Sequence, residues 1–280
     1  LDAGEIVPLH QPHNLSGVEA ARRAFPGTTQ IACFDTAFHR SHPWVADTYA
    51  LPARFYDEGV RRYGFHGLSY EAILRILGER MPEIAGGRLI VGHLGSGASI
   101  CAVAGGRSLA STMGFSALDG LPMGTRCGQI DPGVLLWMMT EKGMDAAAIT
   151  ELLYKESGLK GLSGVGSDVR VLTESDRPEA AAALDYFVHR VRRDIGGMAA
   201  LLGGVDAIVL TGGIGEHAAA IRARILSGFE WLGLRLDADA NAAGATTVSA
   251  AGSAVLALVV PTDEEGTIAR HAKALLERAG

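Results

Sequence analysis

Short apolar segments, glycine clusters and helical segments alternate along most of this chain, and this alternation restricts its fold more than any other feature. Glycine accounts for 37 of the 280 residues, and its clusters follow or join the apolar segments. Strands are predicted at residues 30–34, 88–92, 98–104, 207–210 and 254–260, and helices at 71–77, 177–202, 216–226 and 268–278. Strands that alternate with helices indicate an α/β fold.

Residues 177–202 carry the clearest helical pattern, because their apolar side chains recur at three- and four-residue spacings. Asp176, Pro178 and Glu179 are typical of a helix start, and Gly203 followed by Gly204 is typical of a helix end. Residues 93–97 are predicted to be the turn of a hairpin between strands 88–92 and 98–104. Residues 211–215 are predicted to be a glycine loop between a strand and a helix.

Composition excludes several classes of protein. A net charge of −6 argues against a nucleic-acid surface, and the longest apolar run, within 254–260, is too short to cross a membrane. The three cysteines form no C-x-x-C pair, which argues against a disulfide framework or zinc site and favours a reducing cytoplasm. The first residues contain neither an initiator methionine nor a signal peptide, so we expect a processed or truncated start.

Two glycine segments are candidate anion sites. The turn at 93–97 offers small residues and main-chain N–H groups, although a plain tight hairpin would have the same composition. The segment at 212–215 lies between a predicted strand and helix, where a phosphate can approach the main chain, although it could equally be a plain connection. The chain has neither a Walker A motif nor a G-x-G-x-x-G motif, which excludes a P-loop and argues against a Rossmann dinucleotide site.

Several charged residues stand at positions where they could serve chemistry. Arg126 lies in a glycine-flanked loop, and guanidinium groups bind planar phosphoryl or carboxylate groups, although most loop arginines are surface charges. Asp35 and Glu264 each follow a predicted strand and could position Mg²⁺ through water, or could simply be helix caps or surface carboxylates. His66, between aromatic residues and glycine, could be catalytic or structural.

The full set of motifs, in order, resembles the acetate kinase family. The matching segments are 34–39 (FDTAFH), 62–67 (RYGFHG), 93–97 (HLGSG), 123–126 (MGTR), 130–132 (IDP), 163–164 (SG) with 167–170 (SDVR), 211–216 (TGGIGE) and 261–265 (PTDEE). The resemblance runs from Val7 to the last helix. One such motif could arise by chance, but eight in register are specific.

This resemblance implies an actin-like, sugar-kinase-like (ribonuclease H-like) two-domain ATPase fold whose first domain is incomplete. Residues 39–264 would form the second, nucleotide-binding domain, and residues 1–38 with 265–280 would remain from the first. The implied reaction transfers the γ-phosphoryl group of ATP to acetate, reversibly, and gives acetyl phosphate and ADP. The implied cofactor is Mg²⁺, and the implied assembly is a cytoplasmic homodimer that binds neither nucleic acid nor membrane.

The resemblance also assigns site residues. Asp35, Arg126, His66 and His93 would be catalytic, and Asp35 with Glu264 would organise the metal. Leu9, Phe65 and Ala117 would wall the acyl pocket. The implied ATP-binding residues come from three segments: His93, Leu94, Gly95, Ser96 and Gly97; Asp168, Val169 and Arg170; and Gly212, Gly213, Ile214 and Gly215.

The chain departs from the family pattern in three respects. An N-terminal phosphate loop (Asn-x-Gly-Ser-Ser-Ser) and a second arginine, within a segment on the order of 100 residues, are not present. Tyr70 replaces a common histidine, and Ala117 replaces a common proline of the acyl pocket; His217 is a smaller change. A propionate kinase, a non-catalytic actin-like ATPase domain and an inactive fragment of the same fold are therefore the alternatives.

Overall fold

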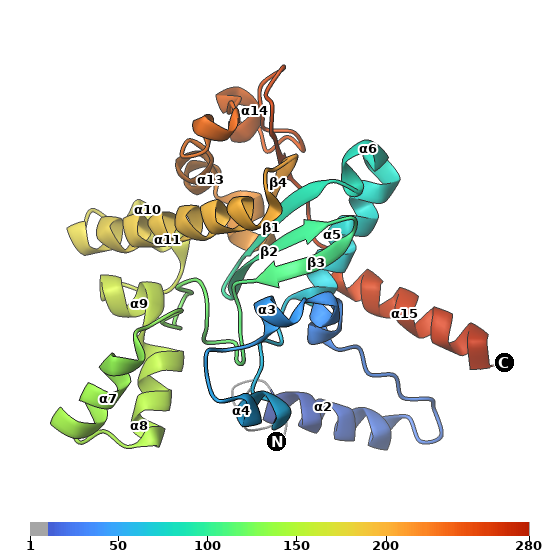
Figure 1. Ribbon diagram of the computed structural model, residues 1–280, viewed down its shortest axis with the longest axis vertical. Coiled ribbons are helices and arrows are strands. Elements are labelled where there is room, and N and C mark those ends of the chain that lie inside the picture. The colour runs from blue at the N-terminus through green and yellow to red at the C-terminus, as the bar shows by residue number, and fades with distance from the viewer. Residues whose placement is uncertain (1–10, 280) are drawn as a thin grey trace.

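A five-stranded mixed sheet organises the chain in the computed structural model, which describes residues 11–279 (Figure 1). The strand order is β3-β2-β1-β4-β5. β1 pairs antiparallel with β2 and parallel with β4, and β4 pairs parallel with β5. The strands are β1 (Arg88–Leu94), β2 (Ala98–Ala104), β3 (Arg107–Ser111), β4 (Ala207–Thr211) and β5 (Leu256–Val259). The predicted hairpin and α/β fold are confirmed.

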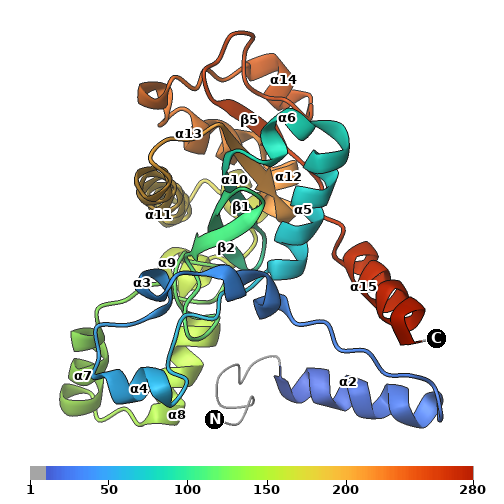
Figure 2. The same ribbon diagram turned by 45° about the vertical axis from the view of Figure 1, so that its right-hand side comes forward.

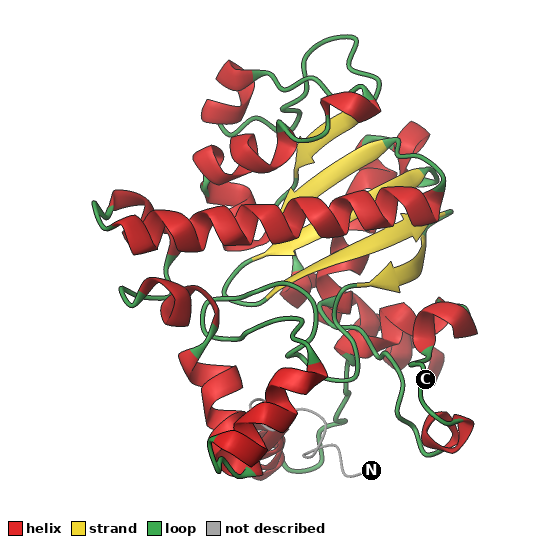
Figure 3. Ribbon diagram, turned by 60° about the vertical axis from the view of Figure 1, so that its left-hand side comes forward, coloured by secondary structure: helices red, strands yellow, loops and turns green. Residues whose placement is uncertain are grey.

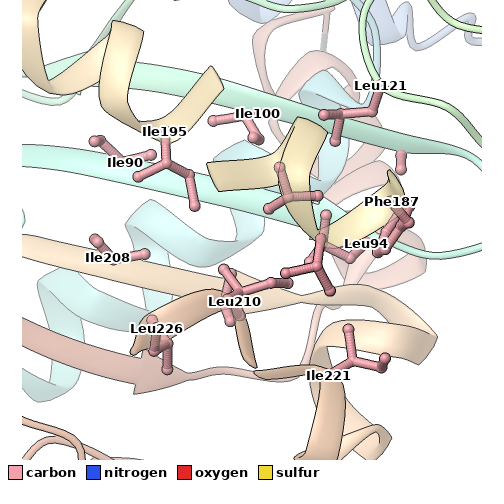
Figure 4. Packing of buried hydrophobic residues seen from close by; sticks show 14 of the residues in the cluster. Ile90, Leu94, Ile100, Leu121, Phe187, Ile195, Ile208, Leu210, Ile221 and Leu226 are labelled. Carbon is pink, nitrogen blue, oxygen red and sulfur yellow. The ribbon is translucent and has the colours of Figure 1, made fainter. Parts of the chain in front are cut away.

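Helices cover both faces of this sheet. The long helix α11 (Pro178–Leu202) lies across one face, where Phe187 and Ile195 belong to the same buried cluster as Ile90 and Leu210 (Figures 3 and 4). Helix α5 (Gly67–Arg80) covers the other face, where Tyr70, Ile73 and Leu77 belong to a second cluster with Leu89 and Val209. Neighbouring strand residues therefore point into different clusters, and burial on both faces explains why these strands are continuous apolar runs.

The boundaries of α11 agree closely with the sequence. The helix begins at Pro178, one residue after the predicted start, with Arg177 rather than Asp176 at the N-cap. It ends at Leu202, and the next residue, Gly203, has a left-handed φ of 64°, a conformation that glycine adopts easily.

Two predicted elements are wrong. Residues 30–34 are not a strand, because no described strand lies beside them to pair with their main-chain groups. Asp35 therefore begins the 3₁₀ helix η1 (Asp35–Ser41) instead of ending a strand. Residues 212–215 are not a loop but the start of helix α12 (Gly212–His217). Glu216 Oε1 accepts a hydrogen bond from Gly212 N (3.0 Å), which supports this glycine-rich first turn despite its weak helix propensity.

Most of the remaining helices lie in two groups around the sheet (Figure 1). Below it lie α3 (Trp44–Asp47), α4 (Ala53–Asp57), α7 (Pro132–Glu141), α8 (Ala146–Glu151), the π-helix η2 (Leu152–Glu156) and α9 (Gly158–Ser163). Near β5 lie α13 (Ala219–Leu226), η3 (Glu230–Leu232) and α14 (Ala238–Ala242) (Figure 2). The short α6 (Pro82–Ala85) follows α5, and α10 (Val169–Glu174) precedes α11.

Two helices near the chain ends project from the body, α2 (Gln11–Ala24) and α15 (Glu264–Ala279) (Figure 2). Helix α15 begins four residues before its predicted start. It is tied to α5 by a hydrogen bond of 2.5 Å between His271 Nε2 and Glu71 Oε1. Within residues 11–279, no helix combines the length and the apolar character needed to cross a membrane.

Candidate active site

The carboxyl ends of the parallel strands β1 and β4 bring two of the predicted phosphate segments together. The turn at Gly95–Gly97 follows β1, and α12 follows β4. A hydrogen bond from Gly95 N to Gly97 O (2.9 Å) closes the turn, and a methyl group on Gly95 would lie 3.8 Å from Gly213 N. Ligands of open α/β sheets commonly bind at this edge.

A cavity of about 460 Å³ opens beside this turn. Its walls come from three distant segments, which contribute Gly95 and Ser96, Ser167 to Arg170, and Gly213 with Ile214, His217 and Ala218. The structure thus brings seven of the predicted ATP-binding residues into one cavity. Leu94, by contrast, is fully buried in the core, and Gly212 packs against the Leu94 main chain.

Asp168 and Arg170 form one unit at the rim of this cavity. Asp168 caps α10 by accepting from Arg170 N (2.9 Å), and its Oδ2 accepts from Arg170 Nη2 (2.6 Å). Those hydrogen bonds hold the pKa of Asp168 below its usual value. The pair is exposed, so it offers a hydrogen-bonding surface to a ligand and contributes little to stability.

Arg126 is buried at the opposite side of the turn. Its side chain reaches from the 123–128 loop, which forms no helix or strand, and Nη1 donates to Ala117 O (2.9 Å). A methyl group on Gly97 would lie only 2.8 Å from Arg126 Nη2 and 3.1 Å from His66 Nε2. No ion pair joins Arg126 to a carboxylate in the described part of the chain, and burial lowers its pKa. A buried guanidinium of this kind favours an anionic ligand.

His66 stacks on His93 with 4.2 Å between ring centroids and 20° between ring planes. His66 is also the only non-glycine residue in the described range with a left-handed backbone, with φ of 58°. Such conformations cost energy and are maintained by their surroundings, most often at functional sites.

The position of the proton on His66 depends on a chain of hydrogen bonds that begins at Tyr70. Tyr70 is fully buried, which raises its pKa and keeps it neutral. The Tyr70 hydroxyl shares a hydrogen bond with Ser99 Oγ, in which either oxygen can be the donor. With Tyr70 as the donor, Ser99 donates to His66 Nδ1 (2.9 Å), and this arrangement places a ring proton on Nε2, the atom beside Gly97.

A second serine fixes His93 in the same way. Thr262 Oγ1 donates to Ser69 Oγ (2.8 Å), so Ser69 donates to His93 Nδ1 (2.8 Å) and the ring proton lies on Nε2. Burial lowers the pKa of His93 to about 4, although the charge of Glu216 opposes this effect. His93 is therefore neutral at pH 7, and the Nε2 atoms of both histidines lie beside the turn.

The two carboxylates predicted to organise a metal face the same space. Asp35 Oδ1 accepts from Leu68 N (3.2 Å), and Glu264 Oε1 lies 3.9 Å from His93 Nδ1. Burial raises the pKa of Glu264, and the negative charge of Asp35 raises it further. A cation between them would relieve both effects. Within residues 11–279, no group of three or more metal-binding side chains is assembled.

Two of the three predicted acyl-pocket residues lie in the described part of the chain. Ala117 is buried and its carbonyl holds Arg126, while Phe65 is half-buried and packs against the main core. Leu9 lies outside the described residues. Sequence reasoning missed Ser69, Ser99 and Thr262. The available signal was helical spacing, since Ser69 and Tyr70 follow His66 by three and four residues.

Comparison with known proteins agrees with these observations. The model of the acetokinase family matches residues 1–270. An acetate kinase of Methylocella silvestris is 60% identical and one of Nitrobacter hamburgensis is 56% identical; the matches cover 98% and 97% of this chain and 68% and 67% of those proteins. This chain therefore spans about two thirds of the length of these relatives.

Solved structures give the same result. The Porphyromonas gingivalis acetate kinase aligns with a TM-score of 0.90 at 39% identity, over 96% of this chain and 69% of that chain. A propionate kinase from Francisella tularensis aligns with a TM-score of 0.89 at 36% identity, and the alignment covers 94% of this chain and 69% of that one. The family model, the sequence identity and the shared fold together show that this chain belongs to the acetokinase family.

Proposed function

We propose that this chain supplies the nucleotide-binding and phosphoryl-transfer residues of an acetate kinase, which transfers the γ-phosphoryl group of ATP to acetate reversibly. One observation carries the proposal: Arg126 Nη2 and His66 Nε2 converge on Gly97, at the edge of a cavity lined by the predicted nucleotide residues. A carboxylate is already ionised at pH 7. The site therefore needs no strong general base, only alignment and neutralisation of charge.

Each group then has a role in the transfer. The adenosine of ATP would lie against Asp168, Arg170 and Ile214, and its phosphates would follow the turn toward Gly97. In the loose transition state of phosphoryl transfer, charge is spread over the equatorial oxygens. The Arg126 guanidinium would neutralise this charge, while the Nε2–H groups of His66 and His93 would donate hydrogen bonds to the same oxygens.

The residues also fit a magnesium ion. Proteins bind Mg²⁺ through one or two carboxylates, with water and phosphate oxygens completing the shell, so Asp35 and Glu264 suffice. Burial and the negative charge of Asp35 both raise the pKa of Glu264, which supports this assignment. When bound, the ion would neutralise charge on the ATP phosphates, which is the general use of Mg²⁺ in kinases.

The metal assignment gives a first prediction. Asp35→Asn and Glu264→Gln should each raise the Mg²⁺ concentration needed for half-maximal activity, because each removes one of two facing charges. Titration of activity with Mg²⁺ at saturating ATP, in a chain extended to the length of its relatives, measures this concentration. Asp263→Asn is the control, because Asp263 pairs instead with Arg75 and Arg270 (3.1 and 2.8 Å). Unchanged titration curves for both site variants would show that these carboxylates do not bind the metal and are only helix caps or surface charges.

The size of the acyl pocket gives a second prediction. Ala117 in place of proline leaves room for about one methylene, and one methylene is worth at most roughly 1–3 kcal/mol of discrimination. We expect propionate to be used within about tenfold of acetate. Hydroxamate trapping of the acyl phosphate, with acetate, propionate and butyrate and in a chain extended to the length of its relatives, measures kcat/KM for each. An acetate preference above about a hundredfold would refute the pocket assignment. Absence of any acyl phosphate would refute the proposed function itself.

The likeness to a solved propionate kinase makes propionate the second candidate substrate. The experiment above separates it from acetate directly, since a propionate kinase would prefer the longer acid. A catalytically inactive nucleotide-binding protein would trap no hydroxamate with any acid.

We also propose the domain division and the assembly. Residues 39–264 would form the nucleotide-binding domain, and residues 1–38 with 265–280 would belong to the other domain. The apolar side chains exposed on α2 and α15, which include Leu15, Val18 and Leu276, support a further partner surface there. Other exposed apolar side chains, Trp44 on α3 and Trp137 on α7, support a homodimer. The three free cysteines support a location in the reducing cytoplasm.

A further inference from the structure

A second cavity, of about 290 Å³, lies outside the proposed active site. It shares no lining residue with the nucleotide cavity. Its polar walls come from η1, from the segment that follows it, and from the strand-free segment before α5: His39, Arg40, His42, Asp47, Arg61 and Arg62. The proposed mechanism uses none of these side chains.

The charge of this cavity is positive in an acidic protein. Three arginines and one aspartate give the lining a formal charge of +3 − 1 = +2, whereas the whole chain carries −6. Arg62 pairs with Asp119 (2.7 Å), which lies outside the lining. No ion pair joins Arg40 or Arg61 to a carboxylate within the described residues. Clustered guanidinium groups repel one another, so an anion between them would be stabilised.

The hydrogen bonds of His39 fix where its proton lies. His39 Nε2 is 2.9 Å from the Phe65 carbonyl oxygen, which can only accept, so Nε2 carries the proton. Burial lowers the pKa of His39 to about 4, so the ring is neutral near pH 7. Nδ1 is therefore an acceptor, and it receives the proton of Ser108 Oγ, 2.8 Å away.

The hydrogen bonds of Ser108 also determine which ring nitrogen of His42 carries the proton. Ser108 has given its only proton to His39, so His42 Nε2, 2.7 Å from Ser108 Oγ, must donate. His42 Nδ1 is consequently an unprotonated acceptor. It is buried and has no hydrogen-bond partner, and Arg61 Nε is buried and unpartnered as well. Buried polar atoms are almost always paired, so two orphaned atoms beside one cationic cavity point to an absent ligand.

We propose that this cavity binds a small dianionic oxyanion between Arg40, Arg61 and Arg62, and that His42 takes up a proton at Nδ1 when it binds. The added N–H would satisfy the orphaned nitrogen by donating to the anion. The cavity would then present three arginines and an imidazolium against one aspartate.

The groups around His42 decide the sign of the pH dependence. Burial lowers the pKa of His42, the carboxylate of Asp47 raises it and Arg62 lowers it; the net result is below 6.5. The neighbouring His39 ring, with centroids 5.2 Å apart, stays neutral. A bound dianion adds negative charge and raises the pKa of His42. Proton uptake on binding then requires affinity to increase as pH falls from 7.5 to 5.5.

Sulfate is the appropriate probe because it remains a dianion throughout this range. The protein for this test is extended at its N-terminus to the length of its relatives and carries Arg126→Ala, so that sulfate cannot bind to the active-site arginine. Sulfate is titrated into this protein in a calorimeter. We expect saturable binding that tightens at least severalfold from pH 7.5 to 5.5. Arg61→Gln should weaken it about tenfold or more, through loss of a charge-assisted contact. Arg170→Ala, on the other cavity, should have no effect.

His42→Gln separates the two halves of the proposal. The glutamine amide can still donate to Ser108 but cannot be protonated, so binding at pH 7.5 should persist while its pH dependence disappears. A retained pH dependence would refute proton uptake by His42. Equal sulfate affinity in Arg61→Gln and its parent would refute the site; if Arg61→Gln does not fold, the exposed Arg40→Gln provides the same comparison. Absence of binding in every variant, as when an acidic side chain of a second copy fills the cavity, would also refute it.

Discussion

Arg126→Ala should lower kcat by roughly 10³-fold or more in a chain extended to the length of its relatives, with a much smaller change in the KM for ATP. The guanidinium lies beside Gly97 with one nitrogen, Nη2, free of the Ala117 carbonyl that Nη1 holds. Its charge is needed most when negative charge develops on the transferring group. Removing it should therefore raise the barrier and leave ground-state binding nearly intact.

Two further variants distinguish charge from geometry. Arg126→Lys keeps the charge but loses the planar fork, so it should recover only part of the lost rate. Arg170→Ala is the matched control, because Arg170 lies on the exposed rim of the nucleotide cavity. It should change the KM for ATP rather than kcat. Circular dichroism must show that Arg126→Ala is folded, because Arg126 also donates a hydrogen bond to the Ala117 carbonyl oxygen. A folded Arg126→Ala variant with near-normal kcat would remove Arg126 from the mechanism.

The sequence predicted those parts of the fold whose pattern is local. Strands β1, β2, β4 and β5 are apolar runs, and α11 has an apolar stripe with glycine at its end, so each element determines its own type. The segment 30–34 is also an apolar run, but a strand requires a neighbour, and local sequence does not show one. In α12, glycine suggested a loop, whereas the contacts of Glu216 and the close packing on Leu94 support a helix.

The candidate site, like the fold, could be predicted from the sequence only where the pattern is local. The motif residues Arg126, His66 and the turn at Gly97 could be named from the sequence, and the structure brings them together. The tautomers of the two histidines could not be predicted, because they depend on Ser99, on Thr262 and on Tyr70, which reach the site from separate elements. Tyr70 was noted only as a departure from the family pattern. Its contact with Ser99 gives the departure a physical role, because Ser99 also hydrogen-bonds His66 Nδ1 and so links the phenol to the position of that ring.

Gly97→Ala is the second change with a large expected effect, and we expect it to lower kcat about 100-fold. A methyl group there would lie 2.8 Å from Arg126 Nη2 and 3.1 Å from His66 Nε2, so both groups must move. Displacement of catalytic groups by about 1 Å can cost on the order of 10²-fold in rate. The backbone of Gly97 is not left-handed, so alanine is compatible with the turn and stability should change little. Measurement of kcat and of the urea unfolding midpoint tests both statements.

The control for this variant is Gly166→Ala, because a methyl group on Gly166 meets no atom within 4 Å and its backbone is likewise not left-handed. Any general effect of replacing a loop glycine should appear in both variants, whereas loss of kcat should appear only at Gly97. If Gly97→Ala retained full activity, Arg126 and His66 would not need to converge on the turn. The phosphoryl group would then have to be placed elsewhere along the cavity, nearer the rim formed by Asp168 and Arg170.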